Sequence, residues 1–125
     1  MALTITRNQT PTFFARLAGS NGAIFDVADF VSGEYTVYKS EKYLLSRVPN
    51  AMLSPVTGFV SVPLDSSVII PAATVTASNL PYNFKFTPTV DEVFPFADTG
   101  IYFVEFRVNP QTGVPIVWQR TIEVI

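Results

Sequence analysis

Hydrophobic and polar residues alternate with a period of two along most of the chain. Near the N-terminus, Leu3 and Ile5 alternate with threonines, and Phe13, Ala15 and Leu17 follow with the same spacing. Alternation of this kind is typical of strands with one buried face, whereas helical spacing is not sustained over any window of useful length. The pattern therefore predicts an all-β fold.

Turn-forming and proline-rich stretches divide the chain into the expected strands. These strands cover residues 3–6, 13–17, 23–26, 34–39, 58–64 and 83–87. Residues 40–51 are the one place where a short helix competes, with Ser40 as a candidate N-cap. Between the last two strands, Pro71 and Pro81 border a run of small residues, which predicts an extended edge or a loop. Residues 40–82 are thus expected to be an irregular middle segment.

The strongest pattern lies in the last quarter of the chain, where residues 101–108 and 116–124 form two long alternating runs. Asn109-Pro110 favours a turn and Gly113 can supply the positive φ of a bulge, so the two runs predict a β-hairpin. The side chains expected to face the core are Tyr102, Val104, Phe106, Val108, Ile116, Trp118, Ile122 and Val124, with Arg120 on the same face. Two strands cannot bury them alone, so a second sheet is expected.

A short motif precedes this hairpin. Asp98, Gly100 and Tyr102 have the spacing Asp-x-Gly-x-Tyr, which in immunoglobulin-like sandwiches forms the tyrosine corner at the start of a late strand. Asp can cap the turn, Gly permits a tight backbone, and the Tyr hydroxyl bonds a backbone group upstream. The motif predicts an immunoglobulin-like antiparallel β-sandwich, and residues 1–125 are expected to form it as a single domain.

Three short segments, at residues 7–13, 21–27 and 98–106, stand before or within expected strands. They read Arg-Asn-Gln-Thr-Pro-Thr-Phe, Asn-Gly-Ala-Ile-Phe-Asp-Val and Asp-Thr-Gly-Ile-Tyr-Phe-Val-Glu-Phe. Together they resemble the N-terminal immunoglobulin-like domain of phage baseplate upper proteins, although Val27 replaces the usual Leu of that family. The resemblance implies a virion part that docks fibres or receptor-binding modules, and none of the matched motifs is catalytic.

Composition narrows the classes of function. The 125 residues include no Cys and no His, so a thiol nucleophile, a Cys-ligated zinc and the usual general base are missing. The sequence therefore predicts no enzyme, and no catalytic, metal or cofactor site. Eight basic residues, spread along a chain of net charge −2, form no stripe that favours nucleic acid. No signal peptide and no run of about 18–20 apolar residues is present, which predicts synthesis in the host cytoplasm and no membrane partner.

Aromatic residues are unusually frequent, with 11 Phe, 5 Tyr and 1 Trp. Bulky groups fall on both faces of some strands, which predicts that an outer face is covered by another subunit. Phe14, Ile101 and Phe103 are the candidate interface residues because they lie opposite the expected core. Residues 66–80 are a candidate arm that adds a strand to a partner.

These observations predict a non-enzymatic structural protein of a bacteriophage particle that forms a homo-oligomer or binds another virion protein. A capsid decoration subunit that bridges major capsid proteins is the first hypothesis, and a baseplate or tail-fibre adaptor is the second. A third hypothesis is a carbohydrate-binding module. It requires exposed coplanar aromatic rings, with Tyr35, Tyr38 and Tyr43 as the candidates, because Trp118 is expected in the core.

Overall fold

The computed structural model describes residues 3–19, 22–39, 62–88 and 99–125. The strands in these ranges are β1 (Leu3–Ile5), β2 (Phe13–Ala15), β3 (Phe30–Lys39), β4 (Val62–Leu64), β5 (Phe84–Phe86), β6 (Gly100–Pro110) and β7 (Ile116–Val124). Three short helical elements accompany them: the 3-10 helices η1 (Val27–Asp29) and η2 (Ser66–Val68), and the α-helix α1 (Ala72–Ser78). Strands dominate the described residues, so the predicted all-β fold is confirmed.

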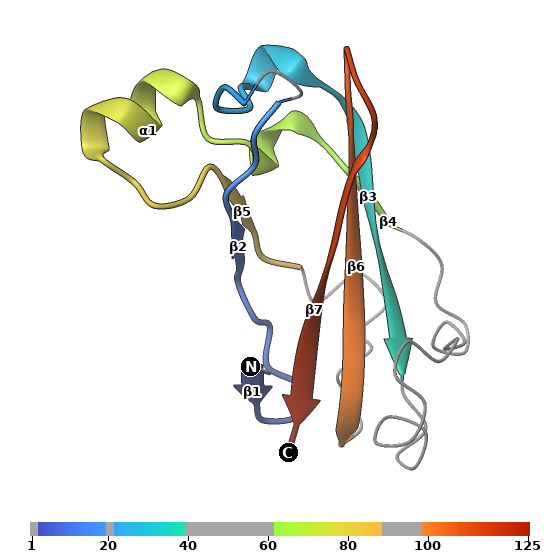
Figure 1. Ribbon diagram of the computed structural model, residues 1–125. Helices are drawn as coiled ribbons and strands as arrows, with labels where there is room; N and C mark the ends of the chain where they lie inside the picture. Colours follow the sequence, from blue (N-terminus) through green and yellow to red (C-terminus); the bar gives the residue numbers. More distant parts are fainter. Residues whose placement is uncertain (1–2, 20–21, 40–61, 89–98) are drawn as a thin grey trace.

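The strands form two sheets that face each other. The large sheet has the order β1-β7-β6-β3-β4, and the small sheet consists of β2 and β5. In Figure 1 the small sheet stands beside the large sheet, and α1 projects above β2 and β5 on the side away from the large sheet. The hydrophobic core fills the space between the sheets, because side chains from both inner faces belong to one buried cluster.

The predicted hairpin is confirmed. Strands β6 and β7 pair antiparallel from Gly100 opposite Val124 to Val108 opposite Ile116. Gly113, in the connection, has a φ of 94°, the left-handed conformation that a turn requires there. The side chains predicted to face the core are buried or pack against it, namely Tyr102, Val104, Phe106, Val108, Ile116, Trp118, Ile122 and Val124.

The core is built around a cluster of aromatic rings that joins the two sheets. Phe106 of β6 lies 5.0 Å from Phe13 of β2, 5.4 Å from Phe84 of β5 and 5.2 Å from Trp118 of β7, measured between ring centroids. Edge-to-face and offset contacts of this kind add to the free energy gained by burying the rings. Phe106 is fully buried and is therefore the centre of the packing between the sheets.

One strand departs from the predicted antiparallel arrangement. Strand β1 pairs with β7 in the parallel direction, with Leu3 opposite Ile122 and Ile5 opposite Val124. This pairing covers the edge of β7 near its C-terminal end, and residues 6–12 then lead from β1 to the small sheet. Alternation along a strand does not specify which strand pairs with it or in which direction, so the sequence pattern cannot reveal this parallel pairing.

The prediction of an extended arm over residues 66–80 is wrong. This region contains η2 and α1. Asn79 ends α1 in the left-handed conformation, and Val75 of α1 is buried. A run of alanines and threonines after a proline is compatible with a short helix, and the helix buries the side chain of Val75.

The observed boundaries of two elements also differ from the predicted ones. The expected strand over residues 23–26 is only an isolated bridge between Ala18 and Ile24, and β3 begins four residues earlier than predicted. The candidate helix over residues 40–51 lies outside the described residues.

Candidate functional site

Phe14 lies on the outer face of the small sheet. Its neighbour Phe13 points inward to Phe106, so the alternation of the strand turns Phe14 outward, where 42% of its surface is exposed. The Phe14 ring packs 4.7 Å from the ring of Tyr82. The ammonium of Lys85, the residue opposite Phe14 in the β2–β5 register, lies 6.0 Å from the Phe14 ring centroid. The prediction that Phe14 faces outward is therefore confirmed.

The other two interface candidates lie on the opposite side of the molecule. Ile101 and Phe103 alternate along β6 with the buried Tyr102 and Val104, so their side chains lie on the outer face of the large sheet. Both are half-buried. The core separates them from Phe14, so the three candidates do not form one continuous surface.

Arg120 of β7 links the two sheets. It was predicted to share a face with the core residues of β7, and its guanidinium Nη2 donates to the backbone oxygen of Phe14 at 3.1 Å. The bond adds a third cation near Phe14, beside Lys85 and the exposed Arg16.

Part of the predicted tyrosine corner lies in the described residues. Tyr102 is 1% exposed at the start of β6, and Gly100 has a φ of 143°, which favours glycine. Asp98 lies outside the described residues. The corner hydrogen bond therefore remains a prediction.

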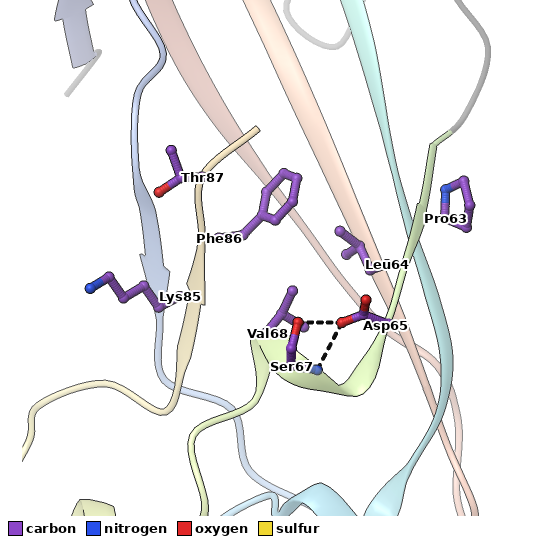
Figure 2. A pocket seen from close by; sticks show the side chains of 8 residues that line it. All are labelled: Pro63, Leu64, Asp65, Ser67, Val68, Lys85, Phe86 and Thr87. Atoms are coloured by element: carbon purple, nitrogen blue, oxygen red, sulfur yellow. Dashed lines mark hydrogen bonds between the residues drawn. The ribbon is translucent and has the colours of Figure 1, made fainter. Parts of the chain in front are cut away.

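A hollow of about 300 Å³ opens between the edge strand β4 of the large sheet and the edge strand β5 of the small sheet. Figure 2 shows Phe86 and Leu64 directed toward the space between the sheets and Lys85 directed away from it. The lining residues are Pro63, Leu64, Asp65, Ser67, Val68, Lys85, Phe86 and Thr87. Apolar side chains form the inner part of this hollow, and polar side chains surround its opening.

The polar pair in the hollow is structural. The Asp65 carboxylate accepts bonds from the Ser67 amide at 2.9 Å and from the Ser67 hydroxyl, and caps η2. These bonds, the hydroxyl first, lower the pKa of Asp65. A carboxylate with a lowered pKa is a weak base, so Asp65 is poorly suited to activate Ser67 as a nucleophile. The Asp65–Ser67 contact therefore has a structural role: it stabilises the start of η2.

The structure does not support the stacking role considered for Tyr35. Its ring is 3% exposed and packs 4.8 Å from the ring of Phe86. Trp118 lies against Phe106 and Phe84, in agreement with the expectation that it belongs to the core. The Tyr38 side chain and Tyr43 lie outside what the structure describes.

Sequence reasoning missed the neighbours of Phe14. Tyr82 and Lys85 are distant from Phe14 in sequence, and only the register of β2 against β5 brings them together. The position of Lys85 opposite the exposed Phe14 ring follows from the pairing of β2 with β5, and it can be recognised only once that pairing is known.

In the ranges that the structure describes, carboxylates do not gather in any group of three or more that could ligate a metal ion. Among these same residues, no helix has the length and apolar character to cross a membrane.

Comparisons of the chain with models of protein families, with curated proteins and with solved structures found no match.

Proposed function

We propose that this chain is a non-enzymatic structural subunit of a bacteriophage particle, and that it binds neighbouring virion proteins through the outer faces of its two sheets. The exposed Phe14, packed on Tyr82 and bordered by Lys85, carries the proposal. Large aromatic rings beside cations, on a surface with few lysines, are typical of protein interfaces.

The fold proposed for this subunit is an immunoglobulin-like sandwich, and the strand order supports it. In that fold strands B and E pair in one sheet, while F lies between C and G in the other, with C′ beside C in the variable type. Here β2 pairs with β5, β6 lies between β3 and β7, and β4 lies beside β3. The buried Tyr102 near the start of β6 stands where the tyrosine corner of strand F is expected.

Placement in a phage particle is supported by the motifs at residues 7–13, 21–27 and 98–106, which resemble those of baseplate upper proteins. The first placement that we propose is capsid decoration, because candidate surfaces on opposite sides of the molecule suit a subunit that bridges two neighbours. These surfaces contain Phe14 on one side and Ile101 with Phe103 on the other. The resemblance favours the second placement, as a baseplate or tail-fibre adaptor.

The test is binding of the purified protein to particles that lack it. Heads and tails of the phage that encodes the chain are purified separately without it, and each is mixed with the wild-type protein and with Phe14→Asp. Val114→Asp is the matched control, since Val114 is 79% exposed in the hairpin connection, away from Phe14. Light scattering of the free protein gives its oligomeric state.

Wild-type protein that coats heads and raises their rupture temperature supports decoration. Phe14→Asp is expected to bind about tenfold more weakly or worse, and Val114→Asp to bind normally. Binding to tails alone places the protein in the baseplate or fibre. Binding to neither particle contradicts the proposal.

A further inference from the structure

The outer face of the small sheet combines aromatic side chains with cations. We call it the basic face and define it by Phe14, Arg16, Tyr82 and Lys85. Phe14 and Lys85 are opposite each other across β2 and β5, and Tyr82 packs against Phe14. Arg16 is exposed two residues after Phe14. Among the residues that the structure describes, no ion pair is formed by Arg16 or Lys85, so their charge is available to a partner.

The outer face of the large sheet combines apolar side chains with carboxylates. We call it the acidic face and define it by Ile101, Phe103, Glu105 and Glu123. The first three alternate along β6 with core residues, and Glu123 lies opposite Ile101 across β6 and β7. Among the described residues, the Glu105 carboxylate accepts a hydrogen bond from the neutral amide of Gln119, at 3.2 Å, and this contact does not neutralise its charge.

A cation occurs farther along the same outer face, but it has a carboxylate of its own nearby. Arg107 lies directly opposite Glu34 in the β3–β6 register, so the two charges offset each other in that part of the sheet. Within the part of the chain that the structure describes, the charges beside Ile101 and Phe103 are therefore the negative ones of Glu105 and Glu123.

We infer that the basic face of one copy binds the acidic face of a second copy, an inference that rests on the proposed assembly role and names the partner. Each face has an apolar centre, Phe14 with Tyr82 on one and Ile101 with Phe103 on the other, and the surrounding charges are opposite. Contact between unlike faces buries both apolar centres and places Lys85 and Arg16 beside Glu105 and Glu123. Contact between like faces brings equal charges together, which disfavours it.

The two faces lie on opposite sides of the core, so the contact is head-to-tail. A contact between two different surfaces leaves one free face at each end, and it therefore continues into a closed ring or an open row of subunits. Such repetition suits a protein that covers a particle. The contact would also contain all three interface residues that the sequence predicted, because Phe14 of one copy would meet Ile101 and Phe103 of the next.

Charge reversal tests the inference. One variant carries Arg16→Glu and Lys85→Glu, and a second carries Glu105→Lys and Glu123→Lys. Each is expected to be a monomer by light scattering at concentrations where the wild type associates, because like charges then meet at the contact. Mixed together, they are expected to form assemblies in which the two variants alternate in equal amounts. The intact acidic face of the first fits the intact basic face of the second, and the two reversed faces fit each other in the same way.

A chain that carries all four substitutions has both faces reversed and is expected to associate again. Association of the wild type is also expected to weaken between about 0.05 and 0.5 M NaCl, because salt screens exposed charges. Far-ultraviolet circular dichroism and melting curves verify that each variant is folded. Val114→Asp, outside both faces, is the control and is expected to associate as the wild type does.

The apolar centres are tested by Phe14→Asp and Phe103→Asp. Each is expected to give a folded monomer, and a mixture of the two is expected to form a one-to-one complex through the face that each retains. If Phe103→Asp fails to fold, Phe103→Ser provides a milder replacement for the same measurement.

Several results overturn the inference. They are a wild type that is monomeric at all accessible concentrations, single reversals that associate normally, and reversed variants that do not complement each other. A wild type that stays monomeric and still coats heads overturns this inference alone. A wild type that associates head-to-tail and binds neither heads nor tails overturns the proposed function alone.

Discussion

The side chain of Asn83 pairs with the backbone of Leu17 in both directions. The Asn83 amide oxygen accepts from the Leu17 N–H at 2.6 Å, and its amide nitrogen donates to the Leu17 carbonyl at 2.8 Å. The same nitrogen donates to the carbonyl of Phe25 at 3.1 Å. Asn83 is 1% exposed. One buried amide therefore holds together the segment that follows β2, the segment before η1 and the segment that leads into β5.

Replacement of Asn83 by Ala is expected to lower the free energy of unfolding by about 2 kcal/mol or more. The Leu17 N–H and the Phe25 carbonyl lose their bonds to Asn83, whereas the Leu17 carbonyl keeps the Phe25 N–H at 3.2 Å. Each orphaned group costs roughly 1–3 kcal/mol. Urea denaturation measures the change. Asn109→Ala is the matched control, because the Asn109 amide donates to the Ser32 hydroxyl at an exposed site, where we expect a loss below about 1 kcal/mol. Equal losses for the two variants would contradict the role assigned to Asn83.

The importance of Asn83 illustrates which features the sequence can predict. Alternation along β6 and β7 identified the core side of both strands, because burial of one face imposes that pattern directly. It also identified Phe14 as an outward residue. Asn83 was placed only in an expected strand, since its partners Leu17 and Phe25 are distant in sequence and are brought close by tertiary folding.

The candidate site was predictable to a smaller extent. Phe14, Ile101 and Phe103 were identified as a set, but the structure places them on opposite outer faces. The strand register that puts Lys85 opposite Phe14 depends on the pairing of β2 with β5, which no local pattern encodes. Likewise α1 was missed, because its short sequence has no amphipathic period and Val75 is its only buried residue.

Acid is expected to weaken the junction between η1 and α1. The Asp26 carboxylate accepts from the amides of Ala72 at 2.9 Å and Val27 at 2.8 Å, and these bonds, Ala72 first, lower its pKa. Because the folded-state pKa lies below the unfolded value of 3.8, the stability that the carboxylate contributes is present above that value. It is lost as the pH falls through the folded-state pKa.

Asp26→Asn tests this pH dependence, since the amide retains an acceptor oxygen but not the charge. The melting temperature of the wild type is expected to exceed that of the variant at neutral pH, and the difference is expected to shrink as the pH falls below the folded-state pKa. Asp65 is present in the wild type and in Asp26→Asn, so its contribution to acid sensitivity cancels in the difference between their melting temperatures. A difference that does not change with pH would show that the charge of Asp26 is unimportant.

Gly33 lies where β3 comes close to both β6 and the ring of Phe30. A Cβ at this position would lie 3.0 Å from the backbone oxygen of Arg107 and 3.3 Å from the Phe30 ring. Gly33→Ala is therefore expected to lower the free energy of unfolding by about 1–3 kcal/mol, the usual cost of overpacking. Chemical denaturation measures it. In Gly33→Ala/Phe30→Leu the ring contact is relieved but the backbone contact remains, so a full recovery would show that the ring alone limits this position.

Tyr102 provides the test of the tyrosine corner. Its ring is buried at the start of β6, directly before Phe103 of the acidic face. Tyr102→Phe removes only the hydroxyl and is expected to lower the free energy of unfolding by about 1 kcal/mol, the usual net value of a hydrogen bond. Tyr82→Phe, at a half-buried position, is the control and is expected to change stability by less than about 0.5 kcal/mol. Identical denaturation midpoints for wild type and Tyr102→Phe would contradict the corner.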